Sequence, residues 1–226
     1  MKTETLSYDV AGSTYLGYLA DGGGRNGVLI CHEGNGLGPQ VKDRAHALAE
    51  LGYVAFCVDY VGGGAVLPDM PSMMAKLGAL RGNPEHVRVL ARAGLAQLAP
   101  RVDRVAATGY CFGGTFALEL ARDGADLAAV VAFHAGLATT RPGPIQAKVL
   151  ACIGADDPDV PPAERAAFEA EMRAAGGDWR LYLYGGAVHG FANPLADAMN
   201  NPAVRYHPAS HRRSWAEMLA LFDEVF

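Results

Sequence analysis

The stretch Gly109-Tyr110-Cys111-Phe112-Gly113 places a cysteine between two glycines, after a short apolar run and before a helical one. This spacing is typical of a sharp strand-to-helix turn that presents a nucleophile, because small residues on either side let the strand and the helix approach closely. The start of a helix also favours a thiolate over a thiol. Taken alone, the pattern fits a nucleophilic Cys111 and a small buried cysteine at an ordinary turn equally well.

A cysteine nucleophile needs a base, and the base needs an acid that orients it. His189 lies in a glycine-rich stretch after the last predicted strand, and Asp157 follows the strand before it. Asp156 and Asp159 stand beside Asp157 and are alternatives for the acid, and an aspartate next to proline is also a common turn residue. The chain order nucleophile, acid, histidine is the order that α/β-hydrolases use, so Cys111, Asp157 and His189 are the candidate catalytic residues.

The loop after the predicted strand 27–31 reads His-Glu-Gly-Asn-Gly and supplies further candidates. We expect the backbone N–H of Gly34 and the N–H of Phe112, which follows the nucleophile, to form an oxyanion hole. Glu33 is placed to accept a hydrogen bond from the thiol of Cys111 and to suppress its ionisation by like-charge repulsion. The alternative is an ordinary solvated loop glutamate.

The substrate-binding candidates follow from their positions beside these groups. Phe112, Phe191 and the segment 61–74 are expected to give the pocket an apolar lining. Arg81 or Arg141 could reach the pocket, although a surface guanidinium is the alternative for each. His32 and His134 each end a strand and could line the pocket or be satisfied core residues. The other histidines are expected at the surface: His46, His86, His207 and His211.

The elements that must position these residues are short apolar runs alternating with helical patterns, which predicts a mostly parallel twisted sheet with helices on both faces. The predicted strands are 3–10, 14–19, 27–31, 54–58, 104–108, 128–133, 148–153 and 179–184, the first two forming an antiparallel hairpin. The predicted helices are 40–51, 84–98, 113–123, 162–175 and 208–225. A loop plus a short helix lying over the sheet is expected between 59 and 84. Ligands of such sheets bind at the carboxyl ends of the strands, where all the candidate residues lie.

The composition narrows the possible partners. A chain of 226 residues with half of them hydrophobic can bury one core, so we expect a single domain over 1–226. The formal net charge of −5 and the lack of a basic cluster argue against nucleic acid and favour a small-molecule substrate. The four cysteines show neither zinc spacing nor a disulfide framework, so no metal or other cofactor is expected.

The N-terminal segment has no signal-peptide pattern, and no apolar stretch reaches the length of a bilayer crossing. We therefore expect a cytoplasmic protein without a membrane partner, as a monomer or a homodimer.

Together these motifs resemble the dienelactone hydrolase family of α/β-hydrolases over almost the whole chain. The resemblance rests on His-Glu-Gly-Asn-Gly-Leu, Gly-Tyr-Cys-Phe-Gly-Gly, Gly-Ala-Asp-Asp-Pro-Asp-Val, Val-His-Gly-Phe and the closing His-Arg-Arg-Ser-Trp. It implies a three-layer α/β-hydrolase fold, a triad of Cys111, His189 and Asp157, and an ester or lactone substrate cleaved through a thioester. It also implies that Glu33 partners the thiol at rest and yields it to His189 when substrate binds.

The sequence departs from the family in the substrate-binding residues. The best-known members hold a substrate carboxylate with arginines, one of them a few residues beyond the catalytic histidine, whereas the residues 190–194 contain none. A general ester or lactone is therefore expected in place of dienelactone itself. Two other functions fit the same fold: a thiol-based redox sensor, for which no resolving cysteine lies nearby in sequence, and a non-catalytic binding module.

Overall fold

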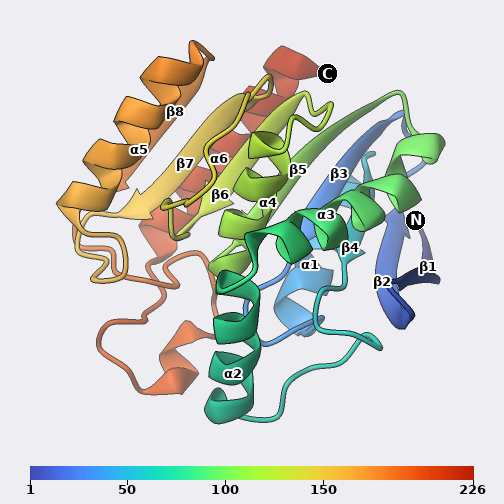
Figure 1. Ribbon diagram of the computed structural model, residues 1–226, viewed down its shortest axis with the longest axis horizontal. Helices are drawn as coiled ribbons and strands as arrows, with labels where there is room; N and C mark the ends of the chain where they lie inside the picture. The colour runs from blue at the N-terminus through green and yellow to red at the C-terminus, as the bar shows by residue number, and fades with distance from the viewer.

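The computed structural model of the protein describes residues 1–226 and contains one eight-stranded sheet with the order β1-β2-β4-β3-β5-β6-β7-β8 (Figure 1). Strands β3 to β8 run parallel, whereas β1 and β2 form an antiparallel hairpin and β2 also pairs antiparallel with β4. The strands are β1 Lys2–Val10, β2 Ser13–Asp21, β3 Asn26–Cys31, β4 Val54–Val58, β5 Arg104–Tyr110, β6 Ala129–Phe133, β7 Lys148–Gly154 and β8 Trp179–Tyr184.

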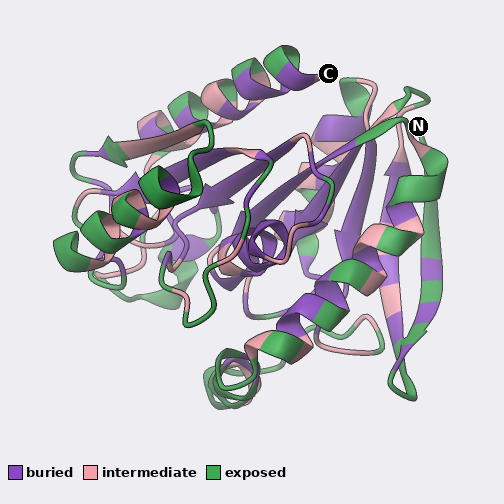
Figure 2. Cartoon of the chain, turned by 45° about the horizontal axis from the view of Figure 1, so that its top comes forward, coloured by how far each residue is buried: buried purple, intermediate pink, exposed green.

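The burial of the strands explains their sequences. The central strands β3, β4, β5 and β6 are almost wholly buried, which is why they read as continuous apolar runs. Strand β1 lies at the sheet edge and alternates buried and exposed residues along its second half. The central strands appear as buried ribbons in Figure 2.

Helices cover both faces of the sheet and create two separate apolar cores. Helices α3, α4 and α5 pack on one face, and α1 and α6 pack on the other (Figure 1). The helices are α1 Pro39–Glu50, α2 Met70–Arg81, α3 Pro84–Leu98, α4 Phe112–Arg122, α5 Pro162–Ala175 and α6 Pro208–Val225, with short 3-10 helices at Ala99–Arg101 (η1) and Ala196–Met199 (η2). This arrangement confirms the predicted three-layer α/β fold. No helix combines the length and the apolar composition that crossing a bilayer requires.

The segment between β4 and α3 differs from its prediction. It holds a full twelve-residue helix, α2, which begins after Asp69 caps its N-terminus through a hydrogen bond from the N–H of Ser72. This helix does not lie over a face of the sheet: it stands beyond the carboxyl ends of the strands, beside the start of α3, and is largely exposed (Figures 1 and 2). The helix η2 was not predicted and lies at the same end of the sheet.

Candidate active site

The turn between β5 and α4 holds Cys111 in a strained conformation. Its φ of +54° lies in the left-handed region that non-glycine residues rarely adopt. A Cβ on Gly109 would lie 2.1 Å from the carbonyl oxygen of Gly113, and one on Gly113 would lie 2.2 Å from that of Cys31. Glycine is therefore required at both positions, and the turn holds a partly exposed Cys111 at the N-terminus of α4.

His189 lies against an aspartate that is fully withdrawn from solvent. Its Nδ1 is 3.0 Å from Oδ2 of Asp157, whose side chain is completely buried. Asp159 lies farther away, with its Oδ2 3.7 Å from the same nitrogen, and its side chain is 70% exposed. Asp156 turns away and accepts a hydrogen bond from the N–H of Gly186. Of the three candidate acids, Asp157 has the geometry to orient the imidazole.

The surroundings of His189 favour its protonated form. Burial disfavours the charge, but the interactions of His189 with Cys111 on one side and with the Asp157 carboxylate on the other outweigh it and raise the pKa of His189 well above its usual value. Cys111 and His189 line the same cavity and interact electrostatically, so the three groups form one interacting set. An imidazole placed this way can exchange a proton with the thiol.

Glu33 lies in the same cavity as Cys111 but is hydrogen-bonded elsewhere. Its Oε2 accepts a hydrogen bond of 2.7 Å from the side-chain amide of Asn193, and its Oε1 lies 3.9 Å from Nε2 of His134. Burial raises the pKa of Glu33, against the opposing effects of the Asn193 hydrogen bond and the positive charge of His189. No hydrogen bond joins Glu33 to Cys111. The hydrogen-bond partner of the Glu33 carboxylate is Asn193, a residue that sequence reasoning missed.

The two proposed oxyanion donors both lie at the cavity. The N–H groups of Gly34 and Phe112 take no part in the hydrogen bonds of the surrounding turns and helix caps. Phe112 is the first residue of α4, where a backbone N–H has no carbonyl one turn before it. A side chain at Gly34 would come within 2.7 Å of Leu77 on α2. Both N–H groups can therefore donate to a ligand.

The loop after β4 is held by one buried carboxylate. Asp59 is completely buried and accepts hydrogen bonds of 2.8 to 3.0 Å from four backbone N–H groups. These belong to Leu16, Val61, Gly62 and Gly64. Asp59 thereby ties the loop after β4 to the hairpin of β1 and β2. The three glycines of this loop, Gly62, Gly63 and Gly64, all have positive φ, a conformation that glycine adopts without strain.

A cavity of about 890 Å³ opens above Cys111 and His189 at the carboxyl end of the sheet. Its apolar part comes from α2 and η2, with Met73 and Leu77 facing inward and Leu195 and Met199 across from them. Arg81 lies in the wall with its guanidinium 5.8 Å from the centre of the Phe112 ring. Of the expected segment 61–74, only residues from Leu67 onward line the cavity, and Val61 does not.

Three other expected lining residues lie elsewhere. Phe191 is completely buried and packs against Tyr184 and His134, so it supports the site from beneath and does not line the cavity. His134 is also completely buried, and its Nδ1 accepts a hydrogen bond of 3.1 Å from the backbone N–H of Cys111. Arg141 pairs with Glu85 at the surface. The structure brings none of these three to the cavity wall.

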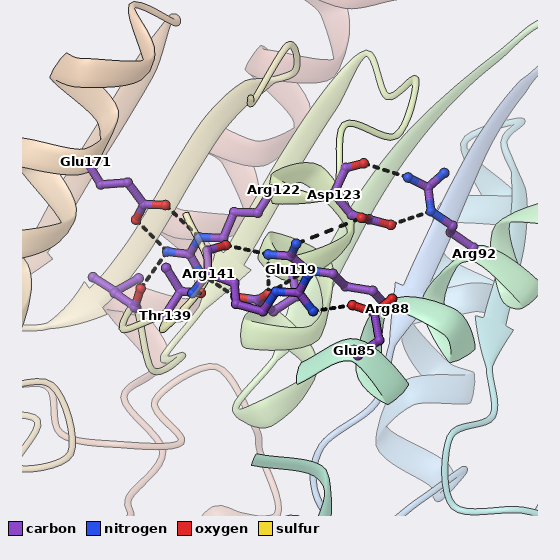
Figure 3. A network of polar contacts seen from close by, with 10 residues as sticks. Glu85, Arg88, Arg92, Glu119, Arg122, Asp123, Thr139, Arg141 and Glu171 are labelled. Atoms are coloured by element: carbon purple, nitrogen blue, oxygen red, sulfur yellow. Dashed lines mark hydrogen bonds and ion pairs between the residues drawn. The ribbon is translucent and has the colours of Figure 1, made fainter. Parts of the chain in front are cut away.

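A buried ionic network holds the wall formed by the loop after β6 (Figure 3). The carboxylate of Glu119 accepts hydrogen bonds from Arg88 and Arg122, and Arg122 also donates to Glu171 at 2.7 and 2.8 Å. Both arginines then donate to backbone carbonyls of that loop, those of Leu137 and Arg141. The network thereby fixes the loop after β6 at Leu137 and Arg141. Other residues of this loop line the cavity: Gly136, Ala138, Thr139 and Thr140.

One group of side chains has metal-ligating atoms close together. The carboxylates of Asp157 and Asp159 and the imidazole of His189 place such atoms within 4.8 Å of one another. The Nδ1 of His189 already pairs with Asp157, so a metal there would compete with the orientation of the imidazole. A metal at these residues would therefore change the geometry described above.

The fold and the motifs agree with one protein family. A model of the dienelactone hydrolase family matches residues 15–226. The chain belongs to the dienelactone hydrolase family. Among curated relatives it is 28% identical over 245 residues to a "Probable 2-oxo-3-(5-oxofuran-2-ylidene)propanoate lactonase" of Bradyrhizobium sp, covering 97% of this chain and 95% of the relative.

Two solved structures are similar along their whole length. The structure named m3DLH is 41% identical, with a TM-score of 0.93, and the match covers 100% of this chain and 98% of that one. A dienelactone hydrolase-like promiscuous phosphotriesterase, P91, from metagenomic libraries is 37% identical with the same TM-score and coverage. As a dienelactone hydrolase family member, the chain is a hydrolase that acts on small-molecule esters or lactones.

Proposed function

We propose that the chain hydrolyses small uncharged carboxylic esters or lactones through a triad of Cys111, His189 and Asp157. The observation that carries the proposal is the continuous set formed by the strained Cys111, the histidine beside it and the buried aspartate 3.0 Å from that histidine. Cys111 and His189 face a cavity large enough for a small ester, and Asp157 lies behind the histidine. A nucleophile, a base and an orienting acid in this order are what acyl transfer requires.

The reaction proceeds in two halves. His189 takes the proton of the Cys111 thiol as the sulfur attacks the carbonyl carbon. The electron pair of the C=O bond moves to the oxygen, which accepts hydrogen bonds from the N–H groups of Gly34 and Phe112. The C–O bond then breaks, His189 gives its proton to the leaving alkoxide, and a thioester on Cys111 remains. His189 next takes a proton from water, whose oxygen attacks the thioester carbon. The C–S bond then breaks, His189 returns the proton to the sulfur, and the carboxylic acid leaves with the thiol restored.

The charges around the cavity favour an uncharged substrate. The cavity is lined by five carboxylates and by one arginine, Arg81. This arginine forms no salt bridge. Of the carboxylates, Glu119 is paired with arginines, and Glu33 and Asp159 lie nearest the reacting groups. A carboxylate on the substrate would therefore meet like charges and lose affinity.

A second candidate activity is the hydrolysis of phosphotriesters. The observation that favours it is the likeness to P91, whose name describes a promiscuous phosphotriesterase, at 37% identity over the whole chain. A phosphotriester is uncharged, so it satisfies the charge requirement of the cavity, and its tetrahedral phosphoryl oxygen would use the same N–H donors.

Turnover of 4-nitrophenyl butanoate tests the main proposal. The wild-type chain should release nitrophenolate, and trapping by acid during turnover should give a chain heavier by one butanoyl group on Cys111. Cys111→Ala should lower kcat by roughly 10⁴-fold or more. Cys152→Ala, which removes a buried thiol from β7, is the matched control and should retain activity. Equal turnover by wild type and Cys111→Ala would overturn the proposal.

A pair of substrates tests the charge preference. We expect 4-nitrophenyl pentanoate to be cleaved at least about tenfold faster, in kcat/KM, than the 4-nitrophenyl monoester of succinic acid, which has similar length and one negative charge. A preference for the charged ester that disappears in Arg81→Gln would contradict the proposal and make Arg81 a carboxylate-binding residue.

The alternative of a redox sensor has less support. Cys31, Cys57 and Cys152 are free, completely buried and placed within strands, so none can act as a resolving cysteine for Cys111 without unfolding.

Four free thiols also agree with a reducing compartment, and we infer that the protein works in the cytoplasm.

A further inference from the structure

We propose that Tyr60 and His32 are positioning residues that hold the Glu33–Gly34 peptide group, so that the N–H of Gly34 faces the substrate oxygen. The inference rests on the proposed function and adds to it a pair of buried side chains that never touch the substrate. Neither residue lines the cavity.

The carbonyl oxygen of Glu33 is the point where these side chains meet. It accepts hydrogen bonds from the hydroxyl of Tyr60 at 3.2 Å and the backbone N–H of Gly36 at 3.3 Å, and it contacts Nδ1 of His32 at 2.5 Å. This carbonyl and the N–H of Gly34 belong to one peptide group. Because the peptide bond is planar and trans, fixing the C=O fixes the N–H in the opposite direction.

Both side chains are locked in the donor state that this arrangement needs. Burial raises the pKa of Tyr60 well above its usual value, so the hydroxyl keeps its proton. Burial lowers the pKa of His32 to about 4, although the contact with the Glu33 carbonyl opposes the shift, so the imidazole is neutral. A carbonyl can only accept, so the single proton of His32 lies on Nδ1; its Nε2, which has no partner, is the unprotonated nitrogen.

The ring of Tyr60 also ties the two halves of the oxyanion hole together. It stacks on His32 with ring centres 3.7 Å apart and on Phe116 of α4 at 4.5 Å. Its edge meets Phe112, the other N–H donor, at 5.8 Å. The hydroxyl has a single proton, which it shares between two carbonyl oxygens: that of His32, the nearer acceptor, and that of Glu33 at 3.2 Å. A rigid ring held on one side by His32, which follows β3, and on the other by Phe116 of α4 keeps both donors at a fixed separation.

The two side-chain donors to the Glu33 carbonyl, Tyr60 and His32, should also strengthen the N–H donor on the other side of the peptide group. Hydrogen bonds to a C=O polarise the group and make its N–H a better donor. Removing one of them should therefore weaken the stabilisation of the oxyanion and leave the nucleophile untouched.

The test is Tyr60→Phe, which keeps the stacked ring and removes only the hydroxyl. We expect kcat for 4-nitrophenyl butanoate to fall about tenfold with KM unchanged, less than the loss caused by deleting an oxyanion donor outright. The inhibition constant of butanal, which adds to Cys111 and places its oxygen in the hole, should rise by the same factor. The rate at which iodoacetamide alkylates Cys111 should stay within twofold of wild type, because that reaction makes no oxyanion.

Tyr8→Phe is the matched control, because Tyr8 is another buried tyrosine whose hydroxyl donates to a backbone carbonyl, that of Asp59 at 2.9 Å. Tyr8→Phe should lower the stability of the protein and leave kcat unchanged.

His32→Phe removes the other side-chain donor to the Glu33 carbonyl. It should give the same three readouts as Tyr60→Phe, so the inference can be tested even if one of the two variants does not fold.

Three results would distinguish the possibilities. A kcat within twofold of wild type in both folded variants would overturn the inference. So would a loss of kcat matched by an equal loss of the alkylation rate, because the defect would then lie at Cys111. An inactive wild-type chain would instead contradict the proposed function itself.

Discussion

The floor and the mouth of the cavity are built on opposite principles. At the floor, Cys111, Asp157 and Glu33 are held by backbone strain, buried hydrogen bonds and glycines that no other residue could replace. At the mouth, α2 and η2 present flexible side chains that are about half exposed: Met70, Met74, Leu195 and Met199. The floor has one arrangement open to it, whereas the mouth can rearrange.

Because the floor is rigid and the mouth is adaptable, we expect the floor to determine the rate of the reaction and the mouth to determine which substrates bind. Groups that bond to the reacting carbonyl must be fixed before the substrate arrives. Methionine side chains have several rotatable bonds and adapt to substrates of different shape. We therefore expect substitutions at the floor to change kcat for every substrate, and substitutions at the mouth to change KM for some substrates only.

The largest effect should come from the acid. Asp157→Asn should lower kcat/KM by roughly 10³-fold or more, because the amide no longer orients His189 or stabilises its positive charge. Asp159→Asn is the matched control, since its exposed carboxylate lies 3.7 Å from the same nitrogen, and should change activity less than threefold. Steady-state kinetics of both variants decide the assignment, and the opposite ranking would make Asp159 the acid.

The ionic network that holds the loop after β6 should contribute to the stability of the protein. Arg122 has a completely buried side chain, and Arg122→Met leaves Glu171 and the carbonyl of Leu137 without their partner. Unfolding by urea should reveal a loss of about 3–5 kcal/mol in the free energy of unfolding. Arg173→Met removes an exposed arginine from a pair on α5 and should change it by less than about 1 kcal/mol. Equal losses in the two variants would show that the network does not hold the wall.

A smaller effect is expected from Glu33, the other carboxylate at the floor of the cavity, on the rate at which Cys111 is alkylated. Glu33→Gln removes a negative charge that repels a Cys111 thiolate, so iodoacetamide should label Cys111 several-fold faster in the variant at pH 8. The pKa of Glu33 is raised, so in the wild type its charge is present at higher pH and is lost as the pH falls through that raised value. The ratio of the two labelling rates should therefore approach one in acid. A ratio of one at every pH would remove Glu33 from the control of the thiol.

The smallest effect belongs to the mouth. Met74→Gln should raise KM for 4-nitrophenyl octanoate about threefold through lost apolar contact, with kcat for the acetate ester unchanged. Val89→Gln replaces a similarly exposed apolar residue on α3 outside the cavity and should change neither value. A fall in kcat for the acetate ester in Met74→Gln would mean that the mouth also shapes the floor.

The sequence predicted the sheet well because buried parallel strands leave continuous apolar runs between helical patterns. It predicted less of α2, because its apolar residues form no single buried stripe: Leu77 is buried, whereas Met70 and Met74, which also line the cavity, are about half exposed. The helix η2 is too short for any periodicity to show.

Within the site, motifs marked the candidate catalytic residues but not the residues that hold them. Gly-x-Cys-x-Gly and the aspartate and histidine loops carry strong local patterns. Asn193, which binds Glu33, is an asparagine in a coil and looks like any turn residue. Glu119 and Arg122 stand three residues apart on α4 and have the pattern of a solvated ion pair; only the packing of the loop after β6 buries them.

The buried carboxylate of Asp59 has a consequence for motion in the free protein. Three successive glycines would ordinarily give the chain after β4 large conformational entropy. With the N–H groups of Val61, Gly62 and Gly64 bound to one side chain, these amides should exchange with deuterated solvent as slowly as those of a strand. The loop beside Tyr60 is then ordered before any substrate enters, so binding loses no entropy in arranging it.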